Sequence, residues 1–230
     1  MRTIAFLSQK GGAGKTTLAA SLAVAAAGTG ERVIAFDLDP QGSLVSWGER
    51  RKAVKAANNL VIEPLEGERL PQLHAILEGL ADVGFTLAVF DTTPNGTAAR
   101  LIALAADICL LPARPTCLDV DVTAATFRAA CLAKRKATFL LNQCPPTHPS
   151  SRTSEAAKAL MCLGALAEPI VSARMDFQDA IAAGLGVTEY AREGRAAREI
   201  EALWSWIRTQ FEGTRSETPI DQRPGGQAAA

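Results

Sequence analysis

The chain has 230 residues, of which 48% are hydrophobic and 21% charged, and its 24 lysines and arginines balance its 24 aspartates and glutamates. This length suits one α/β domain with a sizeable core, and the zero net charge excludes an overall electrostatic attraction to nucleic acid or membrane. No apolar run approaches the roughly 20 residues of a membrane span. The five cysteines contain no Cys-x-x-Cys pair, so we expect reduced thiols in a cytoplasmic protein.

Short apolar stretches alternate with helical patterns along the chain. The expected strands are 3–7, 32–36, 60–62, 85–90, 108–111, 137–141 and 168–171. The expected helices are 15–27, 43–56, 70–80, 96–105, 120–133, 151–163, 176–183 and 196–211. This alternation predicts a three-layer α/β fold, in which a mostly parallel β-sheet has helices on both faces. We expect one domain over residues 1–212, followed by a polar, disordered C-terminal tail over residues 213–230.

A glycine-rich segment separates the first expected strand from the first expected helix. Glycines let backbone N–H groups converge on an anion, and the N-terminus of the helix adds the positive end of its dipole. Lys15 is placed to reach the outer phosphates of a nucleotide, and the Thr16 hydroxyl to ligate Mg²⁺. The common pattern G-x-x-x-x-G-K-[ST] requires glycine at position 9, where this chain has Gln9 followed by a second lysine, Lys10. The segment consists of Lys10, Gly11, Gly12, Ala13, Gly14, Lys15, Thr16 and Thr17.

Aspartates follow two other expected strands. Asp37 and Asp39 follow the second strand, and Asp91 ends the apolar run 87–90. Carboxyl ends of parallel strands meet at one edge of the sheet, so these carboxylates are expected near the glycine-rich segment, where Asp91 would hold a metal through water. Simpler interpretations exist, because Asp39 or Ser43 suits a helix N-cap and Asp91 suits a turn before a Pro-Asn-Gly segment.

These three motifs together resemble the ParA/MinD family of deviant Walker A ATPases, which are P-loop NTPases. The resemblance extends from residue 3 to about residue 211, and the family loop K-G-G-x-x-K-[ST] fits residues 10–16. Asn142, after an apolar strand, resembles a family residue that contacts adenine. The segment 177–190 resembles ParA proteins rather than MinD, and the short, plasmid-type partition proteins are the most similar branch.

The resemblance implies an ATPase, weak alone, that uses ATP and Mg²⁺ and forms a homodimer when ATP binds. Lys10 would cross to the nucleotide of the partner subunit, as an arginine finger does, and Lys15 would stabilise the transferred phosphoryl group. Asp39 would orient the attacking water. The implied catalytic residues are Lys10, Lys15 and Asp39; the nucleotide would contact residues 10–17 and Asn142; and the metal site would involve Thr16, Asp37 and Asp91, partly through water.

The resemblance also implies partners. ParA proteins bind DNA without sequence preference, and a ParB-like activator protein stimulates hydrolysis, which would place this chain on the nucleoid. Phosphate contacts need only positive charge on one surface. The candidate DNA-binding residues are Arg174, Arg192, Arg195 and Arg198. Each of these arginines could equally be solvated or form an ion pair, because Glu189, Glu193, Glu199 and Glu201 lie nearby in the sequence.

Three other functions fit the shared chemistry. A related ATPase could position conjugative transfer machinery, chemoreceptors or microcompartments instead of partitioning DNA. A MinD-like ATPase acts at a membrane surface, but residues 216–224 lack the apolar face of its terminal helix, so no membrane contact is expected. A redox ATPase with an iron–sulfur cluster needs paired cysteines, for which Cys109 and Cys117 are the candidates.

Overall fold

The computed structural model describes residues 1–56, 59–94, 97–132, 135–146 and 151–215. These residues form a six-stranded, entirely parallel sheet of order β3-β2-β4-β1-β5-β6. The strands are β1 (Arg2–Phe6), β2 (Val33–Asp37), β3 (Leu60–Pro64), β4 (Leu87–Asp91), β5 (Ile108–Ala113) and β6 (Ala137–Leu141). The parallel sheet confirms the expected fold class.

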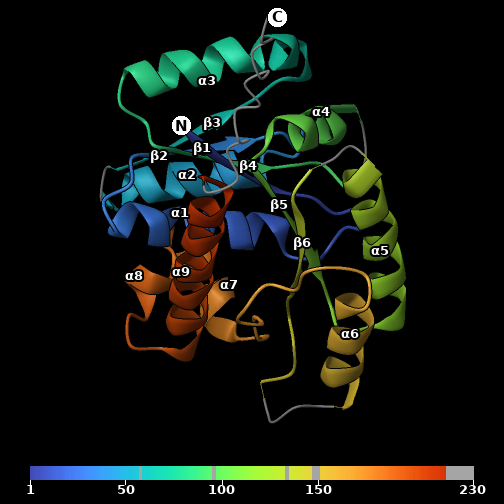
Figure 1. Cartoon of the computed structure of the whole chain (residues 1–230). Coiled ribbons are helices and arrows are strands. Elements are labelled where there is room, and N and C mark those ends of the chain that lie inside the picture. Colours follow the sequence, from blue (N-terminus) through green and yellow to red (C-terminus); the bar gives the residue numbers. More distant parts are fainter. Residues whose placement is uncertain (57–58, 95–96, 133–134, 147–150, 216–230) are drawn as a thin grey trace, which may run out of the picture.

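Helices cover both faces of the sheet (Figure 1). One face carries the 3₁₀ helix η1 (Gly67–Gln72), α3 (Leu73–Asp82), α4 (Thr97–Ala105), α5 (Cys117–Leu132) and α6 (Ser151–Met161). The other face carries α1 (Lys15–Gly28), α2 (Ser43–Ala53), α7 (Met175–Ala182), α8 (Val187–Tyr190) and α9 (Arg195–Arg215). None of the helices in the described ranges is long and apolar enough to cross a membrane.

Each face of the sheet has its own hydrophobic core. Side chains alternate between the two faces of a strand, so Ile4 and Phe6 enter the core under α1, whereas Ala5 and Leu7 enter the core under α4 and α5. Strands buried on both faces must be apolar throughout, which explains the continuous apolar runs in the sequence. The alanines of α1 pack closely between the sheet and α9.

Three expectations about the elements were wrong. No strand forms at 168–171, and the chain makes only isolated bridges on either side of this segment, Phe139 to Leu166 and Cys144 to Ser172. Pro169 lacks the N–H group that a continuous ladder would need at this point. Helix α5 begins three residues earlier than expected, and α9 continues to Arg215, past its expected end at residue 211. The expected domain limit at residue 212 stays a prediction. The rest of the expected tail, residues 216–230, lies outside the described residues.

Strand order gathers the motifs at one edge of the sheet. Phe6 at the end of β1 pairs in register with Asp91 at the end of β4, and Asp91 pairs with Asp37 at the end of β2. The segment that follows β1 therefore lies beside the two carboxylates. This juxtaposition is the expected one for ligand sites of open parallel sheets.

Candidate nucleotide-binding site

The glycine-rich segment forms a loop between β1 and α1. Gly12 and Gly14 have φ angles of 79° and 86°, a left-handed conformation that residues with a Cβ rarely adopt. No side chain caps the N-terminus of α1, and Gly14 itself occupies the N-cap position. The first N–H groups of α1 therefore remain available to an anion at the loop, as in a phosphate-binding site.

Lys15 lies in the first turn of α1 and is only 8% exposed. Desolvation lowers the pKa of Lys15, and the nearby carboxylates of Asp91 and Asp39 offset this effect only in part. An ammonium group in this position is poised to pair with added negative charge, because little water competes for it. Lys15 thus suits contact with the outer phosphates of a nucleotide.

The buried carboxylate of Asp91 has the character of a metal ligand. The residue is 1% exposed, and neither carboxylate oxygen has a hydrogen-bond partner within the described ranges. The pKa of Asp91 is raised to about 7, chiefly by desolvation; the Asp37 and Asp39 carboxylates contribute to the rise, and the neighbouring Thr16 hydroxyl and Lys15 ammonium oppose it. Buried polar groups are normally satisfied, and carboxylate and hydroxyl oxygens are the ligands that Mg²⁺ prefers. Asp91 and Thr16 therefore fit a magnesium site.

Asp37 has a structural task that the sequence pattern did not indicate. Its Oδ2 accepts hydrogen bonds from the backbone N–H groups of Leu44 at 2.8 Å and Val45 at 3.0 Å, and its Oδ1 accepts one from Asp39 at 3.0 Å. The carboxylate thereby caps α2 and holds the 38–43 segment. The alternative interpretation of Asp39 or Ser43 as the N-cap is wrong, because Gly42 occupies that position. A metal contact by Asp37 stays a prediction.

Asp39 lies on the loop that Asp37 holds in place. The Asp39 Oδ1 atom accepts a hydrogen bond from the Gln41 N–H at 3.0 Å, and its carbonyl accepts one from Gly42 at 2.8 Å. The side chain is half-buried and close enough to influence both Lys15 and Asp91. This placement suits a residue that orients water beside a bound phosphate.

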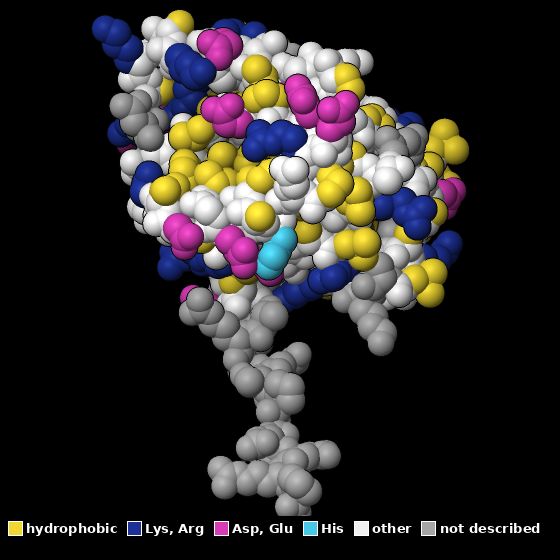
Figure 2. Space-filling view, turned by 90° about the horizontal axis from the view of Figure 1, so that it is seen from above, with side chains coloured by type: hydrophobic (Ala, Val, Ile, Leu, Met, Phe, Trp, Pro, Cys, Tyr) yellow, Lys and Arg dark blue, Asp and Glu magenta, His cyan; other side chains and the backbone are white. Residues whose placement is uncertain are grey.

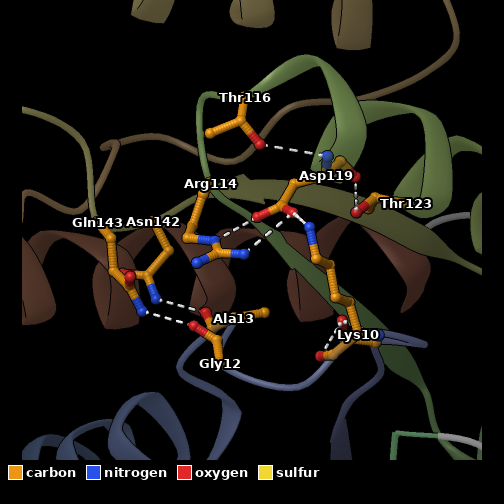
Figure 3. Close-up of polar contacts among 10 residues, drawn as sticks. Lys10, Gly12, Ala13, Arg114, Thr116, Asp119, Thr123, Asn142 and Gln143 are labelled. Atoms are coloured by element: carbon orange, nitrogen blue, oxygen red, sulfur yellow. Dashed lines mark hydrogen bonds and ion pairs between the residues drawn. The ribbon is translucent and has the colours of Figure 1, made fainter.

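Two amide side chains that follow β6 donate hydrogen bonds to backbone carbonyls of the phosphate loop (Figure 3). Asn142 Nδ2 donates a hydrogen bond to the Ala13 carbonyl at 2.8 Å, and Gln143 Nε2 donates one to the Gly12 carbonyl at 2.9 Å. Asn142 is buried, with 4% of its surface exposed. Asn142 thus braces the loop, while its expected contact with adenine stays a prediction.

Lys10 points away from its own loop toward α5 (Figure 3). Its Nζ atom forms an ion pair with Asp119, and Arg114 forms a second ion pair with the same carboxylate. Our sequence interpretation missed Asp119 and Arg114. A local signal was present, because Thr116 and Asp119 have the spacing of a capping box after a strand, and the Asp119 N–H does donate to Thr116 Oγ1 at 3.3 Å.

The four candidate DNA-binding arginines do not behave alike. Arg174 is largely buried and forms an ion pair with Glu199 at 2.7 Å, which gives it a structural contact, and its predicted role in DNA binding stays a prediction. Arg192, Arg195 and Arg198 are exposed near the start of α9. Arg198 Nη2 donates a hydrogen bond to the Glu193 carbonyl at 2.8 Å. These three likewise remain candidates.

The side of the molecule formed by α3 and α4 carries charges of both signs. Figure 2 shows the side formed by α3 and α4, where positive and negative side chains are interspersed with apolar ones. A surface of mixed charge gives little attraction to a polyanion.

The cysteines weighed for an iron–sulfur cluster do not share a surface. Cys109 is buried in β5, whereas Cys117 is exposed at the first position of α5. Burial raises the pKa of the Cys109 thiol to about 12, which disfavours the thiolate that metal binding requires. This arrangement argues against the redox alternative.

A glycine loop between β1 and α1, with carboxylates at the ends of β2 and β4, defines a P-loop nucleotide-binding protein. Residues 4–201 match the model of the CobQ/CobB/MinD/ParA nucleotide binding domain, and the chain belongs to this family. The maintenance of carboxysome distribution protein A of Gloeobacter kilaueensis is 36% identical over 205 residues, which cover 87% of this chain and 89% of that protein. The chromosome-partitioning ATPase Soj of Thermus thermophilus is 37% identical over 128 residues, 46% of this chain and 51% of Soj.

Solved structures share the fold at lower identity. Apo McdA from Cyanothece superposes with a TM-score of 0.73 and 18% identity over 92% of this chain and 99% of McdA. The cell division ATPase MinD of Pyrococcus furiosus superposes with a TM-score of 0.72 and 21% sequence identity, over 91% of this chain and 99% of MinD. A related MinD from Pyrococcus horikoshii was solved as a complex with Mg-ADP, with a TM-score of 0.69. The expected family and fold are both confirmed.

Proposed function

We propose that this chain is an ATP-driven positioning ATPase that forms a homodimer when ATP binds, holds DNA without sequence preference in that state, and releases it after hydrolysis. One observation carries the proposal: the loop has two lysines, and Lys10 is held by Asp119 outside its own phosphate loop. A lysine in this place does not contact the nucleotide of its own subunit. It therefore suits transfer to the nucleotide of a partner subunit.

Within the site, each residue has a defined task. Lys15 and the first N–H groups of α1 bind the outer phosphates, and Asn142 keeps the loop in shape through Ala13. Asp39 orients the attacking water. Asp91 and Thr16 hold Mg²⁺, which when bound neutralises charge on the phosphates. Lys10 from the partner subunit adds a second positive charge, and a partner protein accelerates hydrolysis.

DNA binding is the testable core of the proposal. Binding to random-sequence DNA should require ATP, because a near-neutral monomer has few charges to offer and a dimer doubles them. Replacing Arg192, Arg195 and Arg198 by alanine should weaken binding and reduce the salt dependence by about one unit per lost phosphate contact. Arg69→Ala, which removes an exposed charge on the other side of the sheet, is the matched control. Equal binding with ATP and ADP would contradict the proposal.

The relatives support two kinds of cargo, a DNA replicon and a protein microcompartment. Similarity to Soj and ParA proteins supports DNA partition with a ParB-like partner. The match to a carboxysome distribution protein over 87% of this chain favours a protein microcompartment as the second candidate. Deleting the gene separates them, because partition predicts loss of a replicon over generations, whereas compartment positioning predicts clustered compartments with normal replicon inheritance.

A further inference from the structure

One buried carboxylate holds two cations at the edge of the nucleotide site (Figure 3). Lys10 Nζ donates to Asp119 Oδ1, and Arg114 donates to both oxygens, through Nε to Oδ2 and through Nη2 to Oδ1 at 3.2 Å. The Asp119 side chain is only 4% exposed, whereas those of Lys10 and Arg114 are 37% and 34% exposed. The carboxylate is therefore the fixed part of the cluster.

Both backbone groups of Asp119 form hydrogen bonds with threonine hydroxyls at the start of α5. Its N–H donates to Thr116 Oγ1, and its carbonyl accepts a hydrogen bond from Thr123 Oγ1 at 2.7 Å. Arg114 directly follows β5, so it too is placed by the sheet. Lys10 instead belongs to the loop, next to two glycines. Of the three side chains, Lys10 is therefore the one best placed to move.

Departure of Lys10 would be costly if it left Asp119 alone. A buried carboxylate without a partner pays its full desolvation cost. Arg114 prevents this, because its two hydrogen bonds to Asp119 do not involve Lys10. The N-terminus of α5 stabilises the same negative charge, since Asp119 lies in the first turn. Burial raises the pKa of Asp119, but Arg114 and Lys10 lower it overall, in keeping with a charged carboxylate.

We propose that Asp119 is a resting site that holds Lys10 within its own subunit, and that Arg114 is the positioning residue that keeps Asp119 paired when Lys10 crosses to the nucleotide of a partner subunit. The inference deepens the proposed function and rests on it for the crossing step. The resting site itself concerns the nucleotide-free chain and is testable separately.

The first test measures the ATP concentration that gives half-maximal dimerisation. Arg114→Gln leaves Lys10 as the main partner of Asp119, so this concentration should rise by a factor of about five or more, while turnover of the dimer at saturating ATP stays near normal. Arg114→Lys should restore the normal concentration. Asp119→Asn combined with Arg114→Gln should also restore it, because the resting site is then weakened. Arg128→Gln, an exposed change on the same helix, is the control.

The second test needs no dimer. Competitive acylation of the nucleotide-free protein, read by mass spectrometry, reports how firmly each lysine is held, with exposed Lys52 as the internal reference. Lys10 should react faster in Asp119→Asn and more slowly in Arg114→Gln. Unchanged Lys10 reactivity in both variants overturns the resting site. An unchanged ATP requirement in Arg114→Gln overturns the role of Arg114. A wild-type chain that never dimerises with ATP overturns the proposed function, and acylation still decides the resting site.

Discussion

The Asn142 side chain donates a hydrogen bond to the Ala13 carbonyl at 2.8 Å, across 129 residues of sequence. This bond connects the end of β6 to the loop between β1 and α1. The amide also leaves no room beside Gly14, where an added Cβ would lie 2.4 Å from Asn142 Nδ2. The shape of the phosphate loop therefore depends on a residue from a distant strand.

Replacing Gly14 by alanine should deform the loop. The left-handed conformation alone costs a residue with a Cβ about 1–2 kcal/mol, and Asn142 must also move away from Ala13. We expect weaker ATP binding by isothermal titration calorimetry and a lower Tm. Gly28→Ala is the control, because it lies at the other end of α1 with open space around it, and should raise stability by about 0.5 kcal/mol. Normal ATP affinity in Gly14→Ala would refute the bracing role of Asn142.

Asp39→Ala should separate dimerisation from hydrolysis. Loss of the residue that orients water should lower turnover by about 100-fold or more, while the phosphate contacts of Lys15 and α1 remain. Light scattering should detect an ATP-dependent dimer, and phosphate release should report the lost turnover. Asp37→Asn provides the contrast, because it weakens the cap on Leu44 and Val45 and should reduce stability as well. Normal turnover in Asp39→Ala would remove Asp39 from the catalytic residues.

Lys10→Ala should impair the function of the dimer without preventing ATP binding to the monomer. The Lys10 ammonium contacts Asp119 rather than its own loop, so ATP affinity of the monomer should stay nearly unchanged. Turnover should fall by about 10³-fold, as expected for a charge supplied in trans. Lys15→Ala should instead abolish ATP binding altogether, because its side chain is placed at the phosphates. Mixing Lys10→Ala with an Asp39→Ala chain would test trans action, since one site of the mixed dimer keeps both functional groups.

The ion pair of Arg51 with Glu189 predicts a pH-dependent contribution to stability. It joins α2 to α8 through two hydrogen bonds of 2.6 and 2.8 Å. Burial alone would raise the pKa of Glu189, but Arg51 and the Gly186 N–H lower it below the ordinary value. A carboxylate with a lowered folded-state pKa stabilises the protein above its unfolded pKa of about 4.3, and this stabilisation is lost as pH falls through the folded value.

Glu189→Gln should therefore cost about 3 kcal/mol at pH 7, because the Arg51 side chain is 5% exposed and its ion pair with Glu189 is replaced by a neutral contact. The difference from wild type should shrink below about pH 4. Urea unfolding across this pH range gives the measurement. Glu49→Gln breaks the exposed pair with Lys52 and should leave the free energy of unfolding nearly unchanged at any pH, because solvent screens this pair. A pH-independent effect of Glu189→Gln would contradict the linkage.

Much of this protein follows from short-range patterns. Alternating strands and helices predicted the layered sheet, and the lysine and glycine spacing of residues 10–16 predicted the phosphate loop, since both depend on residues close in sequence. The aspartates after the strands were likewise expected near that loop. Local patterns failed where one residue blocks pairing, as at Pro169, or where a cap begins a helix early, as at Thr116.

Only the tertiary structure decided which distant side chains meet. The strand order places β5 beside β1 and β6 beside β5, which brings Asp119 to Lys10 and Asn142 to Ala13. It also pairs Arg174 with Glu199, a contact that the sequence pattern left open. The sequence by itself determined that a glycine-rich loop with the spacing of a phosphate-binding loop follows β1. Where Lys10 rests was decided by packing, because a parallel sheet joins strands whose neighbours in space are not their neighbours in the chain.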